Sequence, residues 1–149
     1  MANNRKFSAD DASLSVGSII TTRTRKYSDL DSSFLANSNT GDIFISKDAQ
    51  AVKQSVRNLI LTSAFERPFQ PGIGSGIGAL LFELSDAATL STIETYIEIC
   101  IEQYEPRAKV INITADGEID SHYITVEVEF QVITLNETVT LQVVLERLR

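Results

Sequence analysis

The chain has 149 residues, of which 43% are hydrophobic and 22% charged, proportions typical of one soluble globular domain with its own core. The net charge of −7 argues against a nucleic-acid groove, because phosphate recognition relies on clustered Lys and Arg. No apolar run approaches the roughly 18–20 residues that a membrane span requires, which predicts a protein without a membrane partner.

Residues 1–36 are predicted to form an extended N-terminal arm, and residues 37–149 a single domain. The arm is rich in Ser, Asn, Asp and Thr, so it cannot by itself bury enough apolar surface to offset its ordering entropy. Its start lacks the apolar stretch of a secretory signal, and we therefore expect folding in a cytoplasm. Arg23, Arg25 and Lys26 form a small basic patch that is either solvated or docks onto a partner.

A helix is predicted from a cap at Ser46 to about Thr62, because apolar residues recur there at helical spacing. Four glycines follow within residues 71–78. They lack the sixth-place glycine of a dinucleotide fingerprint and the lysine of a P-loop, which argues against phosphate binding. We predict instead a tightly turned loop leading into a short helix over residues 79–84.

The clearest helix follows and ends before Pro106, which removes a backbone donor. Ser91 and Glu94 have capping-box spacing, and Asp86 is the alternative start one turn earlier. Its apolar stripe consists of Leu90, Ile93, Ile97, Cys100, Ile101 and Tyr104.

Two features of this helix bear on function. Cys100 is the single cysteine, so no intramolecular disulfide and no thiolate metal cluster can form, and among isoleucines it is predicted to be a buried thiol. Glu94, Glu98 and Glu102 form an acidic ridge that is either solvated or faces a basic partner. Neither feature implies a metal or an organic cofactor.

After Pro106 the hydrophobic period changes from helical to alternating. Strands are predicted over residues 109–114, 123–134 and 139 to the C-terminus, joined by turns at Asp116-Gly117 and Asn136-Glu137. The fold class is therefore α+β, with N-terminal helices packed on a C-terminal antiparallel three-stranded meander. The last strand carries alternating apolar residues, and an unprotected edge there would invite pairing with another chain.

Three local patterns follow one another along the chain: residues 26–31 with Phe34, residues 66–71 running on to 81–83, and Tyr104-Glu105-Pro106-Arg107-Ala108. Together they resemble the baseplate wedge, or sheath-initiator, family of contractile phage tails, which has counterparts in type VI secretion baseplates and tailocins. The resemblance covers residues 26–148. It implies a structural, non-enzymatic protein of the virion tail baseplate, assembled in the host cytoplasm.

The resemblance also implies partners and site residues. The partners are baseplate wedge proteins, the tail sheath protein, and tail-tube or hub proteins. Glu105, Pro106 and Arg107 are the family's hallmark, either binding the wedge or only shaping the helix–strand corner. The final element, residues 139–148, is implied to share strands with the first sheath ring, and its sheath-binding residues are Val139, Leu141, Val143 and Leu145.

Two rival functions remain. Members of the family resemble proteins labelled lysozyme, and a glycosidase would need two carboxylates, from Glu66, Glu83 or Glu105, one with a raised pKa. Glu105 beside Arg107 is expected to stay ionised, and tryptophan, a common sugar-stacking residue, is absent. The second rival is a regulatory binding module of the anti-adaptor type, which has a similar fold.

Overall fold

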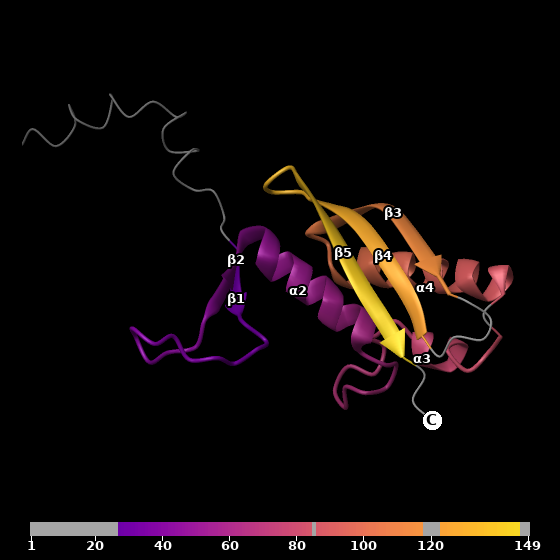
Figure 1. Cartoon of the computed structure of the whole chain (residues 1–149), viewed down its shortest axis with the longest axis horizontal. Coiled ribbons are helices and arrows are strands. Elements are labelled where there is room, and N and C mark those ends of the chain that lie inside the picture. Colours follow the sequence, from indigo (N-terminus) through magenta and orange to yellow (C-terminus); the bar gives the residue numbers. More distant parts are fainter. Residues whose placement is uncertain (1–26, 85, 118–122, 147–149) are drawn as a thin grey trace, which may run out of the picture.

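The computed structural model describes residues 27–84, 86–117 and 123–146 (Figure 1). It confirms the predicted α+β class. Helices α2 (Asp48–Leu61) and α4 (Ala87–Tyr104) pack on an antiparallel sheet with the order β3-β4-β5. The strands are β3 (Ala108–Asp116), β4 (Tyr123–Val132) and β5 (Glu137–Glu146), and a single-turn helix α3 (Ile77–Leu80) lies between α2 and α4 in the chain.

The core lies between the two helices and one face of the sheet, with α4 along β3 and α2 along β5 (Figure 1). Strict alternation in β4 turns Ile124, Val126, Val128, Phe130 and Val132 inward, and each is at most 4% exposed. Burying one such side chain contributes roughly 1.5–3 kcal/mol. The other face of β4 carries polar residues, so among the described elements only one sheet face is covered.

The predicted bounds of the first helix hold, but its predicted cap is wrong. Helix α2 begins at Asp48 after Lys47, which makes no side-chain capping bond. The hydroxyl of Ser46 instead donates to Gln54 Oε1 at 3.1 Å. The N–H of Asp48 donates to the carbonyl of Tyr27 at 2.8 Å, so a residue predicted to lie in the arm supports the start of this helix.

Helix α4 begins at the alternative position. The side chain of Asp86 accepts the N–H of Thr89 at 2.8 Å and caps the helix. The capping box of Ser91 and Glu94 is therefore wrong, since both residues lie inside the helix. The short helix predicted over residues 79–84 starts earlier and is shorter, because α3 follows directly from the left-handed turn at Gly76 (φ 65°).

Residues 28–47 form a hairpin that projects away from the sheet (Figure 1). Its strands are β1 (Ser28–Leu30) and β2 (Ile45–Lys47), with a further bridge between Ala36 and Ile43. The boundary predicted at residue 36 falls inside this hairpin. These strands are too short to show an alternating hydrophobic pattern, so the sequence did not predict them. Side chains such as that of Asp31 bond the nearby backbone in the connecting turns. Residues 1–26 lie outside the described part of the chain, so the extended arm stays a prediction for them. His122 also lies outside the described residues.

Candidate functional site

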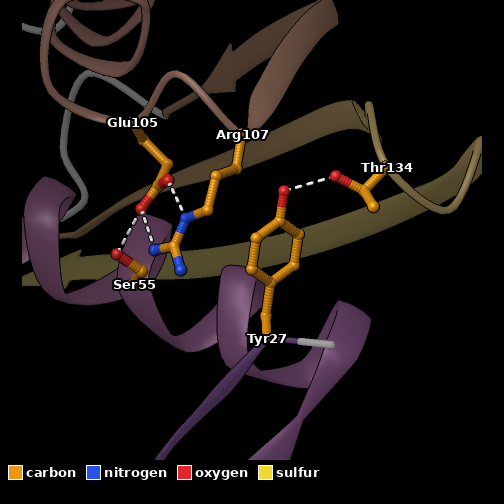
Figure 2. A network of polar contacts seen from close by, with 5 residues as sticks. All are labelled: Tyr27, Ser55, Glu105, Arg107 and Thr134. Carbon is orange, nitrogen blue, oxygen red and sulfur yellow. Dashed lines mark hydrogen bonds and ion pairs between the residues drawn. The ribbon is translucent and has the colours of Figure 1, made fainter. Parts of the chain in front are cut away.

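The Glu105-Pro106-Arg107 triplet forms the corner between α4 and β3. The Glu105 side chain is almost fully buried and receives two bonds from Arg107, with Nε to Oε1 at 2.5 Å and Nη2 to Oε2 at 2.7 Å. The hydroxyl of Ser55, from α2, donates to the same carboxylate. A paired carboxylate thus links the corner to a helix fifty residues earlier in the chain (Figure 2).

Electrostatics keep this carboxylate ionised. Burial alone would raise the pKa of Glu105, but the hydrogen bonds from Arg107 and Ser55 and the charge of Arg107 together lower the pKa below its usual value. A carboxyl group with a lowered pKa is a poor general acid at neutral pH. The expectation from sequence that Glu105 stays ionised beside Arg107 agrees with this geometry.

The corner also holds the start of the described chain. The guanidinium carbon of Arg107 lies 5.1 Å from the ring centroid of Tyr27, a cation–π distance. The hydroxyl of Tyr27 shares a hydrogen bond with that of Thr134, in the turn between β4 and β5 (Figure 2). Sequence reasoning missed Ser55 and Thr134, and it did not connect Tyr27 with the corner, because no local period links residues so far apart in the chain.

The register of the sheet decides which backbone groups of β5 face outward. The N–H of Ile133 donates to the carbonyl of Arg107 at 3.0 Å, which places the odd-numbered residues of β4 toward β3. Backbone groups alternate along an antiparallel strand, so the even-numbered residues of β4 bond to β5. Because Val128 stands opposite Leu141, the odd-numbered residues of β5 bond to β4.

The even-numbered residues of β5 therefore direct their N–H and C=O groups away from the sheet: Thr138, Thr140, Gln142, Val144 and Glu146. Within the described residues, no hydrogen bond reaches these groups. The residues that sequence analysis placed on the sheath-binding strand, Val139, Leu141, Val143 and Leu145, instead point their side chains into the domain's own core. A partner strand at this edge would therefore contact the outward backbone N–H and C=O groups of β5 and the side chains of its even-numbered residues.

The opposite edge, β3, is not open in the same way. A bulge between Val110 and Asn112 breaks its register. The N–H of Ala115, directed away from β4, donates to Glu94 Oε1 of α4 at 2.8 Å. Glu94 thus caps part of this edge rather than being solvated, whereas Glu98 of the same ridge is exposed. Bulges and charged side chains are common devices that block edge pairing.

The other two carboxylates considered for catalysis lie on exposed segments, unlike the buried Glu105. Glu66 lies in the exposed loop after α2 and accepts the N–H of Ser63 at 2.8 Å. Glu83 is exposed beyond α3. Cys100 is buried, as predicted, and burial raises the pKa of its thiol. In the part of the chain that the structure describes, no cluster of side chains suits a metal ion, and no helix is long and apolar enough to cross a membrane.

Comparison with known proteins identifies relatives. The family model described as baseplate wedge protein gp25 matches residues 46–137. Baseplate wedge protein gp25 of Enterobacteria phage T4 is 32% identical over 107 residues, which cover 72% of this chain and 80% of the relative.

Two solved structures share the fold. One, from Geobacter sulfurreducens and described as a tail lysozyme, has a TM-score of 0.60 at 24% identity and covers 66% of this chain and 89% of its own. The other is a chain of the anti-feeding prophage baseplate, with a TM-score of 0.58 at 20% identity, covering 83% of this chain and 88% of its own. At these identities the two structures show the fold alone.

Proposed function

The chain belongs to the family of baseplate wedge protein gp25, and we propose that it is a structural baseplate subunit that binds wedge proteins and initiates the sheath of a contractile tail. In this role it resides in the virion, at the tail baseplate, after synthesis in the host cytoplasm. Its first sheath ring attaches by strand sharing, in which a sheath strand pairs with the outer edge of β5.

The open edge of β5 is the observation that supports strand sharing. The strand is ten residues long, pairs only with β4 among the described strands, and keeps a regular register along its whole length. Its even-numbered residues present, at two-residue spacing, backbone donors and acceptors that no other described residue binds. An extended segment from another chain binds such an edge through main-chain hydrogen bonds.

The corner triplet limits how the wedge can be bound. Glu105 is 3% exposed, and both of its carboxylate oxygens accept hydrogen bonds within the domain, so a partner cannot bind it directly. The side chain of Arg107 is 33% exposed and retains surface that a partner carboxylate could contact. We therefore assign any direct wedge contact of the triplet to Arg107, with Glu105 as the residue that positions it.

We further infer that the protein is not a glycosidase, despite the lysozyme description of one structural relative. The buried carboxylate has its pKa lowered rather than raised, which is the reverse of what the acid of a glycosidase needs. Purified protein should release no muropeptides from peptidoglycan. Release that is abolished by Glu105→Gln, Glu66→Gln or Glu83→Gln would overturn this inference.

Strand sharing is tested by counting sheath-like polymers in negative-stain micrographs after mixing the protein with its cognate sheath protein, with wedge proteins added if they are needed. The test variant is Gln142→Pro, which removes one outward N–H; proline is tolerated on edge strands for that reason. The matched control is Gln142→Thr, which changes the same side chain and keeps the N–H. We expect nucleation by wild type and control and little by the proline variant. Equal nucleation by all three contradicts pairing at β5.

A further inference from the structure

A groove of about 340 Å³ runs beside the last residues of β5. Most of its wall is apolar, from Ile60 and Leu61 at the end of α2, Ile77 and Leu81 in and after α3, and Val144 and Leu145 of β5. None of the described residues that line it belongs to β3 or β4. The groove therefore lies on the flank of β5 that β4 leaves open.

The course of the chain explains why the groove exists. Helix α2 packs against β5 but ends at Leu61, and residues 62–76 that follow contain neither helix nor strand. Beyond the end of α2, the single turn of α3 approaches the end of β5 (Figure 1), and Ser63 and Ser75 of the intervening loop also line the groove. The last part of β5 consequently has core on one side and, on the other, an apolar hollow that no described residue fills.

A strand paired with the outer edge of β5 would lie about 4.8 Å from it, and every second side chain would point toward the helices. Near Leu145 that direction is the direction of the groove. For scale, a cavity of roughly 150 Å³ holds a benzene ring, so the groove has room for one aromatic or two aliphatic side chains. Pockets for alternate side chains are what gives strand addition its specificity.

Gly78 supplies a second, independent observation. It lines the groove from α3, has no left-handed φ, and a Cβ built on it would meet only Ser63 Oγ, at an ordinary 3.7 Å. Neither backbone conformation nor packing therefore requires glycine here, and glycine is a poor helix former. A larger side chain at this position would occupy the groove, so glycine leaves this space open among the described residues.

We propose that this groove receives a large apolar side chain of the sheath strand that pairs with β5. The proposal rests on the proposed function and adds what the partner must carry. Its extended segment needs an aromatic or branched aliphatic residue at the position opposite the end of β5, on the side facing α2 and α3. Main-chain pairing then supplies affinity, and the groove fixes the register of the added strand.

The test measures binding of the tail sheath protein to the full chain, comparing Gly78→Leu with Gly78→Ala. Leucine fills the groove, whereas alanine adds only a methyl group that the fold accommodates. Loss of a buried apolar anchor lowers affinity roughly thirtyfold, which is what we expect for Gly78→Leu. For Gly78→Ala we expect affinity within a few-fold of wild type. Both variants should keep the wild-type melting temperature or raise it.

A second variant guards against misfolding of the first. Leu61 is 48% exposed, so Leu61→Gln is tolerated by the fold and makes the groove polar without filling it. It should also weaken sheath binding. If wild type binds the sheath protein and Gln142→Pro does not, strand sharing stands. Unchanged binding by both Gly78→Leu and Leu61→Gln would then overturn the groove proposal but not the proposed function. If wild type fails to bind, the proposed function itself fails.

The rival occupant is the end of this chain, residues 147–149, which lie outside the described residues. Leu148→Ser in the isolated protein distinguishes the two. We expect an unchanged melting temperature and unchanged sheath binding. A clear fall in the melting temperature would mean that the chain's own end fills the groove, which would overturn the proposal.

Discussion

The ion pair at the helix–sheet corner should be a main determinant of stability, and Arg107→Met tests it. The substitution keeps an unbranched side chain over Tyr27 but leaves the Glu105 carboxylate, 3% exposed, with Ser55 as its remaining side-chain partner. Removing one partner of a buried pair costs about 3–5 kcal/mol. Because Arg107 is 33% exposed, water replaces part of the lost interaction, and we expect a cost of about 2–3 kcal/mol.

The assay is urea unfolding followed by circular dichroism, for wild type, Arg107→Met, Glu105→Gln and the double variant at pH 7. Glutamine removes the buried charge and still accepts from Ser55, so the double variant should recover part of the loss. The cycle should yield a coupling free energy of about 1–2 kcal/mol. An Arg107→Met variant within about 0.5 kcal/mol of wild type would refute the reasoning, because that is the ordinary scatter of surface substitutions.

The pH dependence has a defined sign. The folded-state pKa of Glu105 is lowered, so its ionised form contributes stability above the unfolded pKa and loses it as the pH falls through the folded value. The gap in unfolding free energy between wild type and Glu105→Gln should therefore be full at pH 7 and shrink below the ordinary glutamate pKa of about 4.3. A gap that widens on acidification would contradict the lowered pKa.

Two further substitutions probe the loop and the β3 edge. Gly74→Ala should cost about 3 kcal/mol or more in thermal unfolding, since its φ is 140° and a Cβ would lie 2.7 Å from a backbone oxygen, whereas Gly76→Ala, with open space, should cost about 1 kcal/mol. Glu94→Ala uncaps the N–H of Ala115 and should promote self-association in light scattering, and Glu98→Ala, on the same ridge, should not.

The sequence predicted what local periodicity encodes. Alternation in β4 and β5, the helical stripe of α4 and the stop at Pro106 all reflect burial of one face, and the structure agrees with them. The caps were less predictable. Ser46 and Asp86 are both good capping residues, and only tertiary contacts decide that Ser46 bonds Gln54 while Asp86 caps a helix.

The ion pair at the corner was suggested by the sequence, but the contacts of this corner with the rest of the fold were not. Glu105 and Arg107 stand next to the corner proline, so their pairing is suggested by proximity alone. Ser55 and Tyr27 reach the same cluster only because the fold brings them there. The final strand was predictable as an edge, but which of its backbone groups face outward follows from the register with β4, which no single strand reveals.

Amide hydrogen exchange of β5, measured by NMR with and without the tail sheath protein, tests the central claim most directly. In the isolated protein the N–H groups of Leu141 and Val143 should exchange slowly, because they bond to β4, and those of Thr140, Gln142 and Val144 quickly. Adding sheath protein should slow the three outward amides and leave the inward ones unchanged. Outward amides that still exchange quickly when sheath protein is bound would contradict strand sharing at β5.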